Sequence, residues 1–267
     1  MNLLVRPHAP DADGVMLDIT PASAGWTYVG FRVVRLNAGE VHDGGELGRE
    51  ACLVALTGTA EIVAGGEAFA EVGGRASVFD GAPVSLYVPA GTDYRVIATT
   101  DLELAICTAP ATGAKPVRLI PAAEVGEETR GQGTNTRYVR NILPDTSDLA
   151  ESLLVVEVIT PGGHWSSYPP HKHDRDAFPA ETLLEETYYH RFRRPGGYAV
   201  QRVYTDDRSL DETLTVTDGD AVLVPRGYHP VGAAHGYNLY YLNVMAGPRR
   251  AWRFTNDPAR EWIVRPD

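Results

Sequence analysis

The sequence has few cysteines and no long apolar run. Cys52 and Cys107 are the only cysteines among 267 residues, which is too few for a disulfide framework. Both stand in short apolar segments, as is typical of buried, reduced core cysteines. No apolar run approaches the roughly 18–20 residues of a membrane span, and residues 1–14 lack the apolar segment of a signal peptide. We therefore expect a soluble cytoplasmic protein.

An excess of positive charge is also lacking. The formal net charge is −11, which argues against nucleic acid or an anionic membrane as partner, because both require a basic surface. A local group of arginines could still bind a small anionic substrate against this overall field. Hydrophobic residues make up 43% of the chain, which is enough to build a real core.

Long helical periodicity is absent as well, and short apolar runs take its place. The chain has 19 prolines and 27 glycines, and the runs between them have strand length. This rhythm predicts an all-β sandwich or barrel. The helical candidates are short, at 121–128 and near 257–262. The predicted strands include 28–36, 51–56, 60–65, 84–91, 94–99, 102–110, 153–160, 184–192, 198–205, 214–218, 221–227 and 237–245.

Residues 111–148 are polar and dotted with glycine and proline. We interpret them as a connection with some structure of its own between a first barrel, residues 1–110, and a second, residues 149–267.

The two halves resemble one unit used twice. Pro89 and Pro225 both open a Pro-x-Gly turn after an apolar strand and stand 136 residues apart. The same offset carries Glu186 to Glu50 and indicates an internal repeat. The first copy lacks histidines at the positions that match the second copy's candidate ligands, which hold Arg35, Asn37 and Asp93. We expect a first barrel without metal that serves structure or oligomerisation.

Candidate metal ligands gather in the second half. His171 and His173 form a His-x-His pair whose imidazoles project from one face of an extended chain. In the strand 184–192, alternation places Glu186 on a face with tyrosine and histidine, so we favour it as a ligand over Glu185. His229 follows the Pro-x-Gly turn. Three imidazoles and a carboxylate suit a divalent transition metal.

These residues carry a family resemblance. HKH, a following Glu and PRGYH resemble the metal motifs of the cupin superfamily, although thirteen residues separate Glu186 from His173 and only Tyr228 separates the turn glycine from His229. Over essentially the whole chain, PPHKHD, LEETYYHRF, RYVRNILP and VPRGYHPVG are similar to the 5-deoxy-glucuronate isomerases of inositol catabolism, and more distantly to 5-keto-4-deoxyuronate isomerase. The resemblance implies two tandem cupin barrels and a metal held by His171, His173, Glu186 and His229.

The resemblance also implies an aldose–ketose isomerisation of 5-deoxy-D-glucuronate to 5-dehydro-2-deoxy-D-gluconate. Such a reaction requires a Lewis acid for the developing oxyanion, a group that moves the proton, and a site for the substrate carboxylate. Candidates for the proton are Glu185, Tyr188 and His190. Candidates for the carboxylate are Arg191, Arg202 and Tyr204.

Several alternatives stay open at this point. Zinc or manganese would suffice, because the reaction needs no redox change, while iron, cobalt and nickel also suit these ligands. A metal-dependent dioxygenase, an isomerase of a related uronate, and a non-catalytic sugar-binding protein are the competing functions. A homodimer is compatible with exposed barrel edges.

Overall fold

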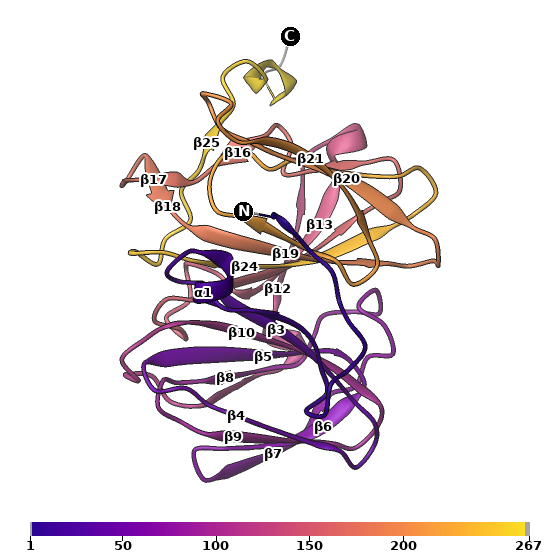
Figure 1. Cartoon of the computed structure of the whole chain (residues 1–267), viewed down its shortest axis with the longest axis vertical. Coiled ribbons are helices and arrows are strands. Elements are labelled where there is room, and N and C mark those ends of the chain that lie inside the picture. Colours follow the sequence, from indigo (N-terminus) through magenta and orange to yellow (C-terminus); the bar gives the residue numbers. More distant parts are fainter. Residues whose placement is uncertain (1, 265–267) are drawn as a thin grey trace. The chain divides into compact units, whose positions relative to one another are not determined.

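The computed structural model describes residues 2–264 as two compact units, both built mainly from antiparallel strands (Figure 1). The N-terminal unit comprises Pro7–Gly126 and Arg140–Val156. The C-terminal unit comprises Met1–Arg6, Glu127–Val139 and Glu157–Asp267.

The unit boundaries differ from those expected at residues 110 and 149. The polar segment 111–148 forms strands that are divided between the two units, and residues 149–156 belong to the N-terminal unit. At the other end of the chain, Met1–Arg6 belongs to the C-terminal unit. The segment is therefore part of both units, because its backbone groups are paired in sheets.

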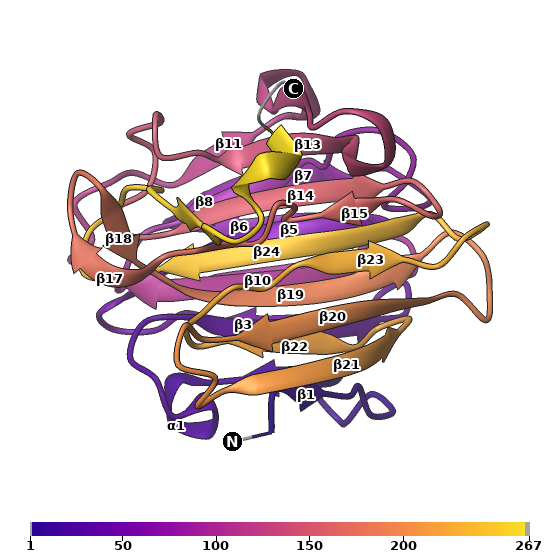
Figure 2. The same cartoon turned by 90° about the horizontal axis from the view of Figure 1, so that it is seen from above.

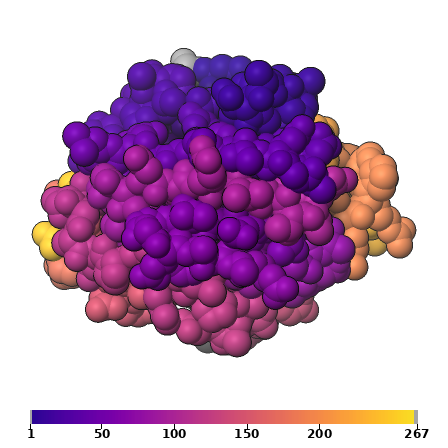
Figure 3. Space-filling model, turned by 90° about the horizontal axis from the view of Figure 1, so that it is seen from below, coloured from indigo at the N-terminus to yellow at the C-terminus, as the bar shows by residue number. Residues whose placement is uncertain are grey.

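The N-terminal unit contains two sheets. The six-stranded sheet has the order β11 (Arg118–Ile120), β8 (Ser85–Val88), β5 (Arg49–Thr57), β10 (Leu102–Pro110), β3 (Gly30–Leu36), β2 (Val15–Ile19). The four-stranded sheet has the order β4 (Val41–Gly44), β9 (Tyr94–Ala98), β6 (Thr59–Ala64), β7 (Glu67–Gly73), and its outer side forms much of the surface in Figure 3.

Alternation along these strands builds the core of the N-terminal unit. In β5, Ala51, Leu53 and Ala55 pack on one face with Ile62 and Val96 of the other sheet. The opposite face of β5 is also buried. On β7, by contrast, most side chains are exposed. The apolar interior thus lies between the two sheets, as in a β-sandwich.

The C-terminal unit repeats this plan. Most of a seven-stranded sheet lies in this unit, although Gly126, residues 140–143 of β13 and residues 154–156 of β14 are assigned to the N-terminal unit. The order of this sheet is β1 (Leu4–Val5), β22 (Ala221–Val224), β19 (Glu185–Phe192), β24 (Leu239–Ala246), β14 (Leu154–Thr160), β13 (Arg137–Leu143), β12 (Gly126–Arg130). Its four-stranded sheet has the order β15 (Trp165–Ser166), β23 (Val231–Ala233), β20 (Tyr198–Tyr204), β21 (Asp211–Thr217), as Figure 2 shows. Two short pairs complete it, β16 (His171–Lys172) with β25 (Thr255–Asn256), and β17 (Asp174–Ala177) with β18 (Glu181–Leu183).

Helices are short, and the all-β prediction is confirmed. The segment expected to be helical at 121–128 contains the 3-10 turn η1 (Ala122–Glu124), and the C-terminal candidate corresponds to η3 (Glu261–Val264). Two further pieces were not anticipated, α1 (Pro21–Ala24) and η2 (Gly133–Asn135). Since no helix within residues 2–264 exceeds four residues, none could cross a membrane.

The strand register corrects one detail of the predicted repeat. Val88 and Val224 each precede a Pro-x-Gly turn. Val88 pairs with Ala51, whereas Val224 pairs with Glu186. Ala51 is therefore the counterpart of Glu186, and the offset of 136 selected Glu50, one residue away. A slip of one residue moves a side chain to the opposite face of the sheet.

The Glu50 side chain lies on that opposite face and binds the backbone of a neighbouring segment. Its carboxylate is fully buried and accepts hydrogen bonds from the backbone N–H groups of Glu151, Ser152 and Leu153 at 2.8, 2.7 and 2.6 Å. The Tyr87 hydroxyl donates a further bond at 2.6 Å. A buried carboxylate needs such partners, and here they fix the segment 151–153 to β5.

Candidate functional site

His173, Glu186 and His229 form a buried cluster inside the C-terminal unit. Glu186 Oε2 lies 3.2 Å from His173 Nε2 and 3.1 Å from His229 Nε2. One ligand atom from each residue lies within 4.8 Å of the others. Two imidazoles and one carboxylate at this spacing can hold a divalent metal ion.

Each member comes from a separate element. His173 follows β16, Glu186 is the second residue of β19, and His229 follows the turn after β22. Gly227 in that turn has a φ of 88°, and a Cβ there would lie 2.4 Å from the carbonyl oxygen of Tyr204. Glycine is therefore required to bring His229 back toward the barrel interior.

Hydrogen bonds to main-chain carbonyls orient the two imidazoles. His173 Nδ1 donates to Leu184 O at 3.1 Å, and His229 Nδ1 donates to Gly227 O at 2.9 Å. Because a carbonyl only accepts, the proton is placed on Nδ1 and Nε2 faces the cluster. His229 Nε2 is buried and, among the described residues, has no partner in hydrogen-bonding geometry. This arrangement fits a metal ligand.

The protonation of the cluster follows from burial and from one carboxylate. Burial lowers the pKa of His229 to about 4. Burial also lowers the pKa of His171, with the neighbouring His229 and His173 adding to the effect. At His173 burial is the largest cause and also lowers the pKa, but the hydrogen bond to Glu186, the charge of Glu186 and backbone hydrogen bonds together outweigh it and raise the pKa. His171 and His229 are thus neutral at pH 7 and have a free lone pair.

His171 stands beside this cluster and lines a cavity of about 590 Å³. Its ring centroid is 4.9 Å from that of His229 and 6.3 Å from that of His173. The cavity lies within the size range of small-molecule sites. The other lining residues are Gly131, Gln132, Asn135, Arg137, Tyr168, Pro169, Phe254, Asn256, Ile263 and Val264.

Arg137 is the cationic side chain among these lining residues. Its Nη1 donates to the carbonyl oxygens of Asn135 at 3.1 Å and Tyr168 at 3.3 Å. Burial lowers its pKa, although a guanidinium stays charged. No pattern in the sequence indicates that Arg137 belongs to the site, because it precedes the His-x-His motif by more than thirty residues.

Two tyrosine hydroxyls lie within the same unit. The Tyr188 hydroxyl is 2.8 Å from Ser167 Oγ, and the Tyr241 hydroxyl is 2.5 Å from Ser166 Oγ. The Tyr188 ring lies 5.7 Å from the His229 ring. Burial raises the pKa of both tyrosines, so both phenols keep their protons at neutral pH.

The other two predicted proton carriers are placed differently. His190 is fully buried, with its ring 6.0 Å from that of Tyr188, and its Nδ1 donates to Asp220 O at 3.3 Å. Burial lowers its pKa to about 4. Glu185 is the neighbour of Glu186 in β19, so its side chain points to the opposite face of the strand.

The predicted carboxylate-binding side chains have other partners. Arg191 Nε donates to Asp218 Oδ1 at 3.0 Å. Arg202 makes a two-pronged contact with Asp211, at 2.7 Å for both bonds. The Tyr204 hydroxyl donates to Asp257 at 2.7 Å. The structure does not bring these three residues to the described lining of the cavity beside His171.

Known proteins match this chain over nearly its whole length. The model of the KduI/IolB family matches residues 3–263. The chain belongs to this family. Proteins named 5-deoxy-glucuronate isomerase are similar to it, one from Geobacillus thermodenitrificans at 54% identity, covering 98% of this chain and 96% of that protein, and one from Listeria innocua at 51%, covering 96% and 95%.

Solved structures of two kinds also match. An IolB-like protein from Salmonella typhimurium is 52% identical, covers 98% of this chain and 99% of its own, and has a TM-score of 0.95. An oxalate decarboxylase from Bacillus subtilis has a TM-score of 0.66 at 13% identity, over 96% of this chain and 79% of its own. The second match shows the fold alone, and the predicted cupin architecture and family are confirmed.

Proposed function

We infer that this chain is an aldose–ketose isomerase that converts 5-deoxy-D-glucuronate to 5-dehydro-2-deoxy-D-gluconate in inositol catabolism. The observation that carries this conclusion is the family match over residues 3–263, together with full-length relatives of that name at about half identity. The buried cluster of His173, Glu186 and His229 supports it, since the reaction needs a centre that stabilises an oxyanion.

We propose that His171, His173, Glu186 and His229 hold one divalent ion. The two Nδ1 hydrogen bonds to carbonyls and the neutral state of His171 and His229 support this ligand set. When bound, such an ion acts as a Lewis acid toward the sugar oxygens. Zinc or manganese is our proposal, because no electron transfer is required.

Arg137 is our candidate for the substrate carboxylate. It lines the cavity that His171 also lines, so a sugar acid could reach both ends at once. Only Nη1 of its guanidinium has described hydrogen bonds, which leaves donors for a planar carboxylate. The contacts of Arg191 and Arg202 with aspartates support this reassignment.

Tyr188 is our candidate for the residue that moves a proton at oxygen. In the reaction a hydrogen moves from C2 to C1, and the hydroxyl proton of O2 must move to O1. A buried, protonated phenol that is hydrogen-bonded to Ser167 can donate to one oxygen and recover a proton through that serine. Burial raises its pKa, so the phenol is protonated at neutral pH and has a proton to donate.

Turnover of 5-deoxy-D-glucuronate, followed by proton NMR under anaerobic conditions, tests the function. We expect conversion of the aldehyde to the ketose without oxygen, and incorporation of solvent deuterium at C1 if the transferred proton exchanges. The keto-uronate substrate of the more distant isomerases serves as the comparison. A requirement for oxygen, seen as turnover in air but not under anaerobic conditions, or preferential turnover of the comparison uronate, would contradict the proposal.

A further inference from the structure

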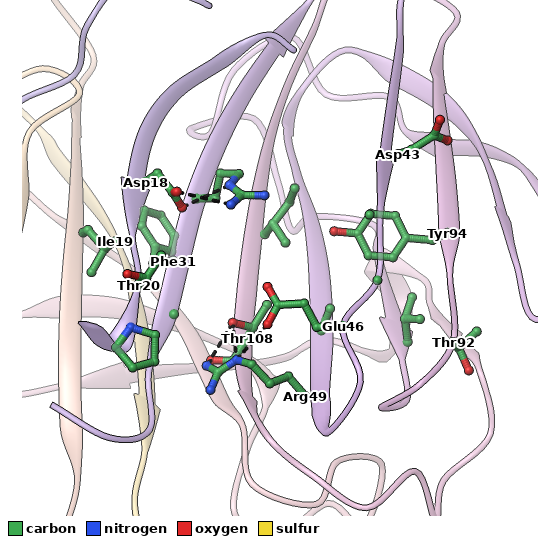
Figure 4. Close-up of a pocket in the computed structure, with 18 of the residues that line it drawn as sticks. Asp18, Ile19, Thr20, Phe31, Asp43, Glu46, Arg49, Thr92, Tyr94 and Thr108 are labelled. Atoms are coloured by element: carbon green, nitrogen blue, oxygen red, sulfur yellow. Dashed lines mark hydrogen bonds and ion pairs between the residues drawn. The ribbon is translucent and has the colours of Figure 1, made fainter. Parts of the chain in front are cut away.

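The N-terminal unit contains its own cavity, about 300 Å³ in volume (Figure 4). Ala51 lies in its lining, together with its cross-strand neighbours Val88 and Thr108. Ala51 is the counterpart of Glu186. The cavity thus occupies the position that the metal cluster occupies in the C-terminal unit, with a methyl group in place of the ligating carboxylate.

Unused hydrogen-bonding groups face this cavity. Arg32 donates to Asp18 from Nε at 3.0 Å and from Nη2 at 3.2 Å, and within residues 2–264 its Nη1 has no hydrogen-bond partner. The Tyr94 hydroxyl likewise has none among the described residues and points toward the middle of the cavity, where the Glu46 carboxylate also lies (Figure 4). Burial raises the pKa of Tyr94 to about 12, so this phenol can donate at neutral pH.

Two glycines keep the cavity open. A Cβ on Gly44 would lie 2.3 Å from the Tyr94 hydroxyl oxygen, and a Cβ on Gly30 would lie 2.4 Å from Thr108 Oγ1. Both contacts are too short for any real side chain. Substitution at either position would therefore displace a polar group from the cavity wall.

Each charged side chain of the wall has an oppositely charged partner, and the partner of Asp43 is Arg95, outside the lining. Arg32 faces Asp18, and Arg49 lies 3.4 Å from Glu46. Arg49 also donates to Thr108 and to the carbonyl of Tyr28. A balanced wall gives no particular attraction to an anion, whereas its mixed donors and acceptors can satisfy hydroxyl groups, each of which donates and accepts. Ala51, Val88 and Ile106 add an apolar side.

We propose that this cavity is a second small-molecule site, which binds a neutral polyhydroxylated ring compound, a cyclitol or a monosaccharide. The site is separate from the metal cluster and goes beyond the isomerase reaction. Its volume lies at the lower end of the range of small-molecule sites and fits a single ring. The Tyr94 and Arg32 donors and the Glu46 acceptor would engage hydroxyls, while the apolar side would contact C–H groups.

Titration calorimetry and saturation-transfer NMR on the metal-loaded protein test this site. The probes are myo-inositol and D-glucose as neutral ring compounds, with D-glucuronate as an anionic comparison. We expect saturable binding of at least one neutral probe. Tyr94→Phe should raise its dissociation constant about fivefold through loss of one hydrogen bond, and Ala51→Leu should abolish binding by filling the cavity.

Two controls separate this site from the isomerase site. Tyr94→Phe should keep isomerase activity, which shows that the variant is folded. Arg137→Ala, which alters the other cavity, should leave binding of the neutral probe unchanged. The proposal is overturned if no neutral probe binds, if D-glucuronate alone binds, if Tyr94→Phe has no effect, or if Arg137→Ala abolishes binding.

Discussion

At the scale of single residues, the Nδ1 hydrogen bonds determine what the buried imidazoles can do. His173 and His229 each donate to a carbonyl, which leaves Nε2 facing Glu186. An imidazole held in this tautomer is prepared to bind a cation, and rotation of either ring would break the carbonyl bond.

Replacing His229 should therefore remove metal and activity together. We expect His229→Ala to lose bound metal and to lower kcat/KM by at least about 100-fold, because a ligand and its orienting bond are lost together. Plasma mass spectrometry measures the bound metal, and turnover rates followed by NMR measure the loss of activity. His235→Ala is the matched control, since His235 is exposed in the same unit. Full activity in His229→Ala would contradict the ligand assignment.

Arg137 gives a second prediction at this scale. We expect Arg137→Ala to raise KM by roughly 10- to 100-fold, because the variant loses a charge-assisted hydrogen bond to the substrate carboxylate. Arg202→Ala should leave KM within about twofold, because that side chain is bound to Asp211 at a half-exposed site. Steady-state kinetics of the two variants decide between Arg137 and Arg202. A larger rise of KM in Arg202→Ala than in Arg137→Ala would indicate that Arg202 binds the substrate carboxylate.

His190 should make stability depend on pH. Burial lowers its pKa to about 4 in the folded protein, against about 6.5 when unfolded. Stability is therefore complete above pH 6.5 and is lost as pH falls toward 4, by about 2 kcal/mol between pH 7 and pH 5. Urea unfolding of metal-free protein should show this loss, and His190→Gln should reduce it by that amount. An identical pH profile in the variant would refute the prediction.

The sequence predicted some site residues and missed others for a physical reason. Strand alternation indicated Glu186, since a short-range period decides which side chains share a face. Arg137 could not be found in this way. It reaches the cavity because β13 and the segment after β15 meet in the fold, where its guanidinium donates to Tyr168 O. Such long-range proximity leaves no local pattern.

At the scale of elements, the short strand β1 completes the edge of the C-terminal sheet. Leu4 pairs with Val222 and Val5 with Ala221. Leu3 is 1% exposed, and its carbonyl accepts a hydrogen bond from Leu223 N at 2.8 Å. Without β1, strand β22 and its backbone groups would lie at an open edge next to the turn that holds His229.

Truncating Leu3 should therefore destabilise the C-terminal unit. We expect Leu3→Ala to lower the free energy of unfolding by about 2–3 kcal/mol, in the range for a buried leucine. Leu47→Ala is the control and should change it by less than about 0.5 kcal/mol, because Leu47 is 95% exposed. Denaturant unfolding measures both. If Leu3→Ala lowered the free energy of unfolding by as little as Leu47→Ala, β1 would contribute little to the stability of the C-terminal unit.

Strands were easier to predict than their register. Runs such as 51–56 and 102–110 fall within β5 and β10. The offset of 136, however, selects Glu50, where cross-strand pairing identifies Ala51 as the counterpart of Glu186. Two adjacent residues look alike in a sequence comparison but face opposite sides of a sheet, and only pairing resolves them.

At the scale of the whole molecule, the proposed metal ligands all belong to one unit. Trp165, Trp252 and Trp262 lie in the C-terminal unit, and Trp26 lies in the N-terminal unit. In Trp26→Phe, the remaining tryptophans report on the C-terminal unit. Removing the metal with a chelator should lower the midpoint of thermal unfolding, followed by tryptophan fluorescence, by several degrees. The reason is that metal at 100 times its dissociation constant adds about 2.7 kcal/mol to the free energy of unfolding.

The complementary variant is the control. With the other three tryptophans replaced by phenylalanine, Trp26 reports on the N-terminal unit, and its midpoint should not move on chelation. A larger shift for Trp26 than for the other three tryptophans would contradict a metal site confined to the C-terminal unit.

The division of the chain into units was the least predictable property. Polar composition in 111–148 suggested a connection, yet Glu127–Val139 belongs to one unit and Arg140–Val156 to the other. Composition reports which residues tolerate solvent and gives no information on which sheet edge a strand will complete. The assignment of Met1–Arg6 to the C-terminal unit illustrates the same limit.

The placement of β1 also sets an order of events during synthesis. Leu4 and Val5 leave the ribosome long before their partners Ala221 and Val222, which follow more than 200 residues later in the chain. The apolar N-terminal segment must therefore remain unpaired while the intervening residues are made and the first unit folds. Nascent chains arrested before β22 should thus expose this segment to chaperones, and its protection from protease should begin only after β22 has emerged.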